Sequence, residues 1–254
     1  MPLTVSLIAR KGGVGKTSAV MNLAGAALED GASRVVVIDL DPQSSLSKAL
    51  LGPAVVDQLR PLCTVHSVVA GDRRAVDVLM DTAIPGLRIV PGYQDLVVPS
   101  DAVIDLRDVD ADLILVDTPP DTKNPGVRAA LLASHAVVSP LIPEALAMHS
   151  VHGIQQLLMS AGLVSNPSLM FAGWLVSMRQ RIAMHDACES TLRRLHGGTV
   201  FDTVIPSLAA FKEASAAGVP ITRHAPKSTG AKVVRALWAE LLDRVAVSAE
   251  RGAA

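Results

Sequence analysis

Cysteine is scarce in this sequence, with Cys63 and Cys188 the only two among 254 residues. They stand far apart and form neither a C-x-x-C pair nor another metal-binding pattern, so we expect reduced thiols rather than disulfides or a zinc site. No apolar run reaches the roughly 18 residues that a membrane-spanning helix needs. No basic and then apolar leader precedes the first expected strand either. We therefore expect a cytoplasmic protein without a secretory signal.

Net charge is also nearly absent from the chain. It carries 23 Lys and Arg against 24 Asp and Glu, a formal net charge of −1 at pH 7. A field this weak cannot hold nucleic acid, so any DNA contact needs a local basic patch. Hydrophobic residues, by contrast, make up 50% of the chain, enough at this length for one sizeable core. We expect a single domain over residues 1–254, with residues 52–85 as an elaboration of it.

Short apolar runs alternate with segments of helical periodicity along most of the chain. Such alternation predicts an α/β fold in which a mostly parallel, twisted sheet has helices on both faces. The expected strands are Leu3–Ala9, Arg34–Leu40, Leu87–Pro91, Leu113–Asp117, Ala136–Ile142, Leu169–Ser177 and Val200–Ile205.

A glycine-rich stretch, Ala9-Arg10-Lys11-Gly12-Gly13-Val14-Gly15-Lys16-Thr17, lies between the first expected strand and a helical pattern. This context of strand, loop and helix is what a phosphate-binding P-loop requires. Its glycines let successive backbone N–H groups turn toward phosphate oxygens, and the following helix adds its positive dipole end. Lys16 is placed to reach the β- and γ-phosphates, and the Thr17 hydroxyl is placed to coordinate Mg²⁺. Arg10 stands where the general pattern has its first glycine.

Two further strand-like runs end in carboxylates. One leads into Asp39-Leu40-Asp41-Pro42-Gln43, where strand alternation puts both acids on one face. The other ends in Asp117, which Thr-Pro-Pro follows. Four apolar residues before an acid form a Walker B pattern, in which the carboxylate holds magnesium, usually through water. Acids at the carboxyl ends of parallel strands lie where such sheets bind ligands.

Together these motifs resemble those of the ParA/MinD family of P-loop ATPases. The loop is similar to the deviant Walker A motif of that family, K-G-G-x-G-K-[ST], with Lys11 as its first lysine, and the acidic runs resemble its D-x-D-P-Q and D-T-P-P segments. Later stretches, Ile205-Pro206, Glu213-Ala214 and Gly218-Val219-Pro220-Ile221, resemble the ParA/Soj branch. The chain end, Val247–Ala254, does not look like the basic amphipathic tail of MinD-like members, so no membrane partner is expected.

The resemblance implies an ATPase that uses ATP and Mg²⁺ and forms a homodimer when it holds ATP. Lys11 would cross to the nucleotide of the other subunit, and Asp41 would orient the attacking water. Hydrolysis would be slow without a ParB-like activator protein. The implied catalytic residues are Lys11, Lys16 and Asp41, and the implied metal-shell residues are Thr17, Asp39 and Asp117. The implied nucleotide contacts are Lys11, Gly12, Gly13, Val14, Gly15, Lys16, Thr17, Ser18 and Pro206.

Members of this branch also bind DNA without sequence preference, which implies a nucleoid-associated ATPase that partitions chromosome or plasmid DNA. The branch commonly has arginines directly after Ile-Pro, whereas this chain continues Ser207-Leu208-Ala209-Ala210-Phe211-Lys212. DNA contacts are therefore expected elsewhere in the C-terminal third. No extension precedes the first strand, so a helix-turn-helix operator-binding domain is not expected. The expected DNA contacts are Arg193, Arg194, Lys212 and Arg223.

Other functions on the same scaffold stay open. A related ATPase could position a protein complex or organelle, and an ATP-dependent ligase of the cobyrinate or dethiobiotin synthase kind would transfer phosphate to a small acid. An iron protein of the nitrogenase kind would need cluster-ligating cysteines after the Walker B strand, and none lies between Asp117 and Ala187. A bacterial tyrosine kinase usually bears a tyrosine-rich tail, whereas Tyr93 is the only tyrosine. His149 and His152 could share a metal, but no third ligand is near them in the sequence.

Overall fold

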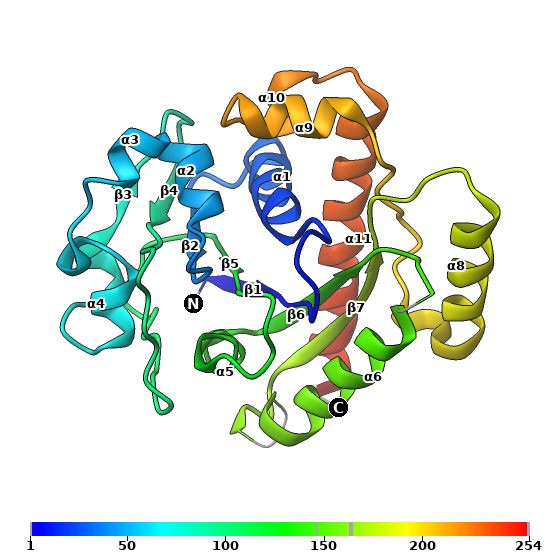
Figure 1. Ribbon diagram of the computed structural model, residues 1–254, viewed down its shortest axis with the longest axis horizontal. Coiled ribbons are helices and arrows are strands. Elements are labelled where there is room, and N and C mark those ends of the chain that lie inside the picture. The colour runs from blue at the N-terminus through cyan, green and yellow to red at the C-terminus, as the bar shows by residue number, and fades with distance from the viewer. Residues whose placement is uncertain (1, 146, 163–164, 253–254) are drawn as a thin grey trace.

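The computed structural model describes residues 2–145, 147–162 and 165–252. These residues form one seven-stranded sheet, in the order β3-β4-β2-β5-β1-β6-β7, with helices on both faces (Figure 1). Paired strands run parallel except at one edge, where β3 is antiparallel to β4. The expected α/β class is confirmed. The strands are β1 (Leu3–Leu7), β2 (Val35–Asp39), β3 (Met80–Asp81), β4 (Leu87–Val90), β5 (Leu113–Asp117), β6 (Ala136–Leu141) and β7 (Met170–Val176).

Apart from the edge strand β3, the strands are largely buried on both faces, which explains why they read as mainly apolar runs in the sequence. In β2, Val35 and Val37 join the core beneath α1 and α11, while Val36 and Ile38 join the core on the opposite face. The helices are α1 (Lys16–Glu29), α2 (Ser45–Leu51), α3 (Pro53–Val56), α4 (Val65–Val69), α5 (Pro125–Ala133), α6 (Ala147–Leu157), α8 (Ala183–His196), α9 (Ala209–Ala216), α10 (Ile221–His224) and α11 (Thr229–Gly252).

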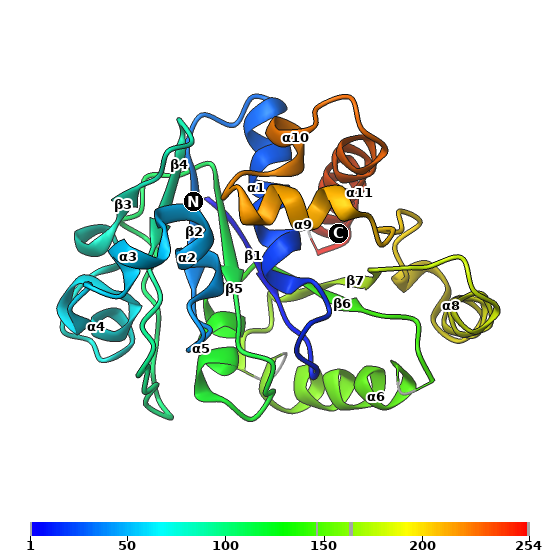
Figure 2. The ribbon, with the colours of Figure 1, turned by 45° about the horizontal axis from the view of Figure 1, so that its top comes forward.

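Helices α9 and α10 lie over α1 and α11, whereas α8 stands apart beyond β7 (Figures 1 and 2). Short 3₁₀ turns cover Pro61–Cys63, Ala75–Val78 and Gly197–Thr199, and α6 continues as a π-helical turn over Leu158–Gly162. Residues 52–85 hold α3, α4 and the edge strand β3. Across the described ranges, no helix has the length and apolar character to cross a bilayer. Residues 253–254, at the end of the stretch expected not to be a membrane tail, lie outside the described part.

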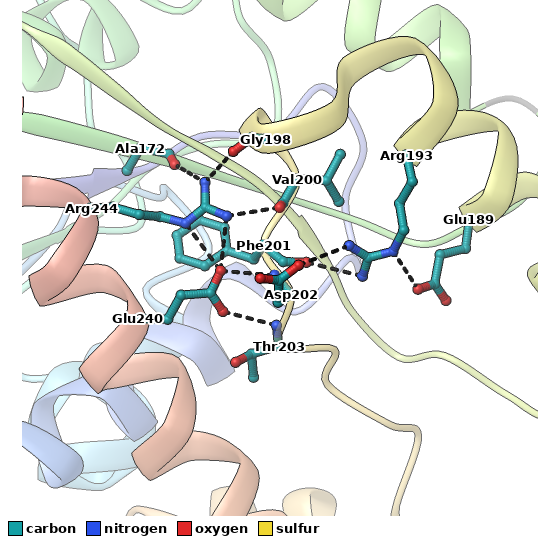
Figure 3. A network of polar contacts seen from close by, with 10 residues as sticks. All are labelled: Ala172, Glu189, Arg193, Gly198, Val200, Phe201, Asp202, Thr203, Glu240 and Arg244. Atoms are coloured by element: carbon teal, nitrogen blue, oxygen red, sulfur yellow. Dashed lines mark hydrogen bonds and ion pairs between the residues drawn. The ribbon is translucent and has the colours of Figure 1, made fainter. Parts of the chain in front are cut away.

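The expected strand Val200–Ile205 is not formed, so this prediction is wrong. Isolated bridges and a few backbone hydrogen bonds join this segment to β7 and the chain after it, without a continuous ladder. Among these bonds, the Phe201 and Ile205 N–H groups donate to the Trp174 and Val176 carbonyl oxygens at 2.9 Å each. Its middle N–H groups, those of Asp202 and Thr203, each donate at 2.8 Å to the carboxylate of Glu240 on α11 (Figure 3). A side-chain acceptor therefore takes the place of a strand partner, which interrupts the ladder.

Candidate functional site

The glycine-rich loop connects the carboxyl end of β1 to the first turn of α1. Gly13 and Gly15 have φ values of 74° and 87°, in the left-handed region that a side chain disfavours. Lys16 is the first residue of α1, and it is only 6% exposed. The loop thus places bare backbone and the N-terminus of a 14-residue helix at one edge of the sheet, which suits an anion.

Thr17 and Asp117 meet directly beside this loop. The Thr17 hydroxyl donates to Oδ2 of Asp117 at 2.6 Å, because β1 and β5 are neighbours and Leu7 is in register with Asp117. Burial, followed by the neighbouring Asp39 carboxylate, raises the pKa of Asp117 to about 8. Its other oxygen, Oδ1, is buried and has no hydrogen-bond partner among the described residues. A hydroxyl beside a buried carboxylate with an unused oxygen fits Mg²⁺, which takes few protein ligands and keeps several waters.

Lys16 lies in the field of two of the predicted acids. Burial lowers the pKa of its ammonium group, while the charges of Asp117 and Asp41 act in the opposite direction. A desolvated ammonium gains more from a nearby anion than an exposed one does. The arrangement therefore favours binding of a phosphate at Lys16.

Asp39 is fully buried, and its carboxylate accepts hydrogen bonds from the segment that leads into α2. Its Oδ2 accepts hydrogen bonds from the Ser47 backbone N–H and hydroxyl at 2.9 and 2.7 Å, and its Oδ1 accepts one from the Asp41 N–H at 3.2 Å. Burial raises the pKa of Asp39 to about 6, against these hydrogen bonds. Among the described residues, neither Lys16 nor Thr17 hydrogen-bonds to it. Its place in a metal shell stays a prediction, whereas a role in fixing the start of α2 is visible.

Asp41 is partly exposed, at the rim of the site. One of its oxygens, Oδ1, accepts a hydrogen bond from the Gln43 N–H at 2.9 Å, which closes the turn before α2. Asp41 and Gln43 both line the open cavity described next. Asp41 is therefore the predicted acid with access to a bound nucleotide and to water.

One open cavity of about 1090 Å³ brings most of the predicted nucleotide residues together. Its volume accommodates a ligand of nucleotide size. Met178, which follows β7, and Leu208 also line this cavity, although sequence reasoning did not select them. Met178 has a φ of 52°, which is unusual for a residue with a side chain, but this strain is visible only in the structure and no sequence pattern marks the residue. The predicted residues on its wall are Gly12, Gly13, Gly15, Lys16, Thr17, Ser18, Asp41 and Pro206.

Val14 and Lys11 are not on the wall of this cavity. Val14 is buried, and its carbonyl oxygen accepts a hydrogen bond from the Ser177 hydroxyl at 2.7 Å. The Lys11 ammonium pairs with Glu144 at 2.8 Å, on the segment between β6 and α6. Sequence reasoning did not select Ser177, the last residue of an expected strand, or Glu144, which lies two residues after another expected strand. Their partners lie more than 130 residues away, so no local pattern identifies them.

The four predicted DNA contacts do not form one patch. Arg193 on α8 pairs with Glu189 at 2.9 Å and donates to the Phe201 carbonyl oxygen at 3.0 Å, inside a polar network (Figure 3). Arg194 is exposed on the same helix, beyond β7. Lys212 on α9 and Arg223 on α10 are exposed on two adjoining helices above α1. The geometry thus favours Lys212 and Arg223 over Arg193, whose guanidinium is already engaged.

His149 and His152 both lie exposed on α6. Within the part of the chain that the structure describes, no group of three or more His, Cys, Asp or Glu side chains could hold a metal ion. Cys63 and Cys188 are free thiols.

Comparisons with known proteins agree with these motifs. A family model described as an AAA domain matches residues 3–169. The chain is 34% identical over 250 residues to the chromosome-partitioning ATPase Soj of Thermus thermophilus, covering 95% of this chain and 96% of that protein. It is 31% identical to the chromosome partitioning protein ParA of Caulobacter vibrioides, covering 96% and 95%. A solved cobyrinic acid a,c-diamide synthase from Mycobacterium smegmatis, with bound ATP analogue and magnesium, is 26% identical with a TM-score of 0.79, covering 95% and 94%.

Proposed function

Because the chain belongs to the ParA/Soj-type partition ATPases of the ParA/MinD family, we propose that it is an ATP-driven dimerisation switch that partitions chromosome or plasmid DNA. In this proposal, Mg-ATP binds at the P-loop and two subunits close face to face over two nucleotides. The dimer holds DNA without sequence preference. Hydrolysis loosens the dimer and releases the DNA, and a ParB-like partner speeds a step that is otherwise slow.

The observation that carries this proposal is that Lys16 and Thr17 line one open cavity, while the buried Asp117 accepts a hydrogen bond from the Thr17 hydroxyl. Backbone N–H groups of the loop would bind the phosphates, and Lys16 would bind the β- and γ-phosphates. The Thr17 hydroxyl and the unpartnered oxygen of Asp117 would hold magnesium. When bound, the ion neutralises charge on the phosphate oxygens. Pro206, which also lines the cavity, would contact the remainder of the nucleotide.

Asp41 is assigned to the hydrolytic water. It lies at the rim of the site, where one of its oxygens is fixed by the Gln43 N–H. A carboxylate held in this way can accept a hydrogen bond from a water aligned with the γ-phosphate. Phosphoryl transfer depends mainly on such positioning, together with neutralisation of charge.

Lys11 is assigned to the nucleotide of the partner subunit. In the single subunit it does not enter its own nucleotide cavity but pairs with Glu144 outside it. More than half of the Lys11 side chain is exposed, at 54%. A lysine that points outward beside the P-loop can reach a second triphosphate only when another subunit approaches.

DNA binding is assigned to the face formed by α9, α10 and the start of α11. Lys212, Arg223, Lys227 and Lys232 are all exposed there. For a chain with a net charge of −1, one such patch binds phosphates weakly. Two patches in one dimer act on the same duplex, which raises the apparent affinity steeply.

Analytical ultracentrifugation with Mg²⁺ and a saturating, non-hydrolysable ATP analogue tests the proposal. The wild type should dimerise. Lys16→Ala should lose nucleotide binding, whereas Lys11→Ala should bind nucleotide as a monomer and fail to dimerise. A wild type that stays monomeric when saturated overturns the proposal. A Lys11→Ala variant that dimerises normally removes only the assignment of Lys11.

An ATP-dependent ligase is the second candidate, because the solved cobyrinic acid a,c-diamide synthase is 26% identical over nearly the whole chain. Such an enzyme would transfer phosphate from ATP to a small carboxylic acid. The two functions separate in a steady-state ATPase assay. Turnover that rises with DNA and a ParB-like protein supports partition, whereas turnover that requires an added organic acid supports the ligase. Turnover that rises with a scaffold protein but not with DNA would indicate positioning of a protein complex.

A further inference from the structure

Two adjacent cations of the P-loop, Arg10 and Lys11, both reach the segment that runs from β6 into α6. Figure 2 shows this loop, in dark blue between β1 and α1, extending toward α6. The approach follows from the topology, because β1 and β6 are neighbours and their carboxyl ends lie at the same edge of the sheet. The two contacts differ in chemistry, because Arg10 binds a backbone carbonyl oxygen whereas Lys11 binds a carboxylate.

Arg10 makes the more permanent of the two contacts. Its Nη1 donates to the His149 carbonyl oxygen at 3.1 Å. Its side chain also lies directly over Gly153, where an added Cβ would overlap the guanidinium and the end of the stem. A glycine in the middle of a helix costs about 1 kcal/mol relative to alanine, so space for Arg10 explains its presence. This contact uses a backbone acceptor and shape, and it does not depend on a side-chain charge.

Lys11 makes the more easily broken contact. Its ammonium group lies 2.8 Å from Glu144 Oε2, and the two side chains are 54% and 39% exposed. An ion pair this exposed contributes little to stability, because water and salt compete with it. A triphosphate presents several negative charges, so it is the stronger partner for the same ammonium.

We propose that Glu144 is a positioning residue that holds Lys11 on its own subunit until a second ATP-bound subunit arrives. Arg10 keeps the loop attached to α6 while Lys11 exchanges Glu144 for the phosphates of the partner. This inference rests on the proposed function, because it concerns the timing of dimer closure. Glu144 therefore acts through Lys11 and opposes dimerisation in the single subunit.

The first test uses the ADP-bound monomer and needs no dimer. The Glu144 and Ala147 N–H groups, which donate to Ile142 and Glu144 carbonyl oxygens, report on the turn that carries Glu144. Hydrogen exchange at these amides should be up to about fivefold faster in Lys11→Ala and in Glu144→Gln, the amount that an exposed ion pair can contribute. The double variant should exchange no faster than either single one. Additive effects, or no effect in Lys11→Ala, overturn the proposal.

The second test measures the dimerisation constant with the non-hydrolysable ATP analogue. Each dimer opens two pairs, so Glu144→Gln should strengthen dimerisation by up to about 25-fold, with unchanged ADP binding by the monomer. Glu29→Gln is the matched control, since it removes a similarly exposed pair with Arg235 at the far end of α1 and should leave dimerisation unchanged. Unchanged or weaker dimerisation of Glu144→Gln overturns the proposal. If the wild type itself never dimerises, the proposed function fails, whereas the monomer test still reports on the pair.

Discussion

At the scale of single residues, the three predicted acids differ mainly in what surrounds them. Asp117 is fully buried beside Thr17, and Asp39 is fully buried beside Ser47. Asp41 alone among them is partly exposed and lines the cavity. The sequence places all three at strand ends but assigns no environment to each. Burial then decides which acid can reach a water molecule.

Asp41→Ala should produce an ATP dimer that persists on DNA, because the carboxylate that aligns the attacking water is lost while the phosphate and metal contacts remain. Single-turnover ATP hydrolysis and the lifetime of the DNA complex measure this. Asp41→Asn is the conservative control variant, since its side-chain oxygen can still accept a hydrogen bond from the Gln43 N–H. It should be as slow as Asp41→Ala. Rapid turnover by Asp41→Ala would remove this residue from its role.

Glu240 is a carboxylate whose ionised form the fold requires. Burial raises its pKa, but hydrogen bonds from the Thr203 and Asp202 N–H groups and from Arg244 outweigh burial, so the pKa lies below its ordinary value of 4.5. A depressed pKa in the folded state gives stability that is present above about pH 4.5 and is lost as the pH falls through the folded value. Acidification should therefore weaken the hold of α11 on residues 202–203.

Glu240→Gln should flatten this part of the pH dependence. It should lower the free energy of unfolding at pH 7 by about 1–3 kcal/mol, the worth of hydrogen bonds to a charged group. Below pH 4 the difference from the wild type should shrink, because the wild-type carboxyl is then protonated as well. Urea unfolding at several pH values measures both effects. A difference in unfolding free energy that does not change with pH would show that the charge of Glu240 is not responsible for the stabilisation.

At the scale of elements, Glu240 also shows where sequence reasoning reaches its limit. Six of the expected strands were recovered within a few residues, because each is a mainly apolar run that is largely buried. Residues 200–205 have apolar residues at both ends but Asp202 and Thr203 in the middle, and they lie along a sheet edge. There the Glu240 carboxylate and the Arg244 guanidinium take backbone groups that a strand would have paired (Figure 3). The pattern of a segment cannot reveal a partner on another helix.

A substitution on helix α6 tests whether Arg10 packs against Gly153. Gly153→Ala should displace the Arg10 side chain, whose far end occupies the space of the new methyl group. In an Arg10→Ala background the same substitution should stabilise the protein by about 1 kcal/mol, because only the gain in helix propensity remains. In the wild type the gain should be smaller by about 0.5–1 kcal/mol. Urea denaturation of the wild type, the two single variants and the double variant gives the coupling free energy between Arg10 and Gly153. Strictly additive effects would show that the Arg10 side chain does not pack against Gly153.

At the scale of the whole molecule, the topology explains why the motifs converge although they are far apart in the chain. The strands β2, β5, β1 and β6 are neighbours and parallel, so the residues that follow them gather at one edge of the sheet. This much follows from motif order and the general rule for parallel sheets. The direction of Lys11 does not follow, because its partner Glu144 lies 133 residues away. Side-chain orientation at the site depends on tertiary contacts that no local pattern contains.

The basic residues of the C-terminal third lie on two separate parts of the molecule, and their surroundings distinguish them. Arg193 on α8 and Arg179, which precedes α8, are both paired with Glu189 on α8, and Asp202 lies close to Arg193. Arg194 therefore stands in mixed surroundings, which weaken its attraction for DNA. On the face of α9, α10 and α11, no ion pair to Arg223, Lys227 or Lys232 occurs among the described residues. This second face also borders the nucleotide cavity through Lys212.

Lys212→Ala and Arg223→Ala should each weaken DNA binding about equally for all sequences, because they remove phosphate contacts rather than base contacts. Each dimer loses two contacts, so the slope of log affinity against log salt should become shallower by about 2. Arg194→Ala is the matched variant on α8 and should leave both quantities unchanged. Fluorescence anisotropy with two unrelated duplexes at several salt concentrations, using the ATP-analogue dimer, measures this. If Arg194→Ala alone weakened binding, the DNA surface would have to be moved to α8, and closure over the nucleotide would then have to bring the α8 helices of both subunits onto one duplex.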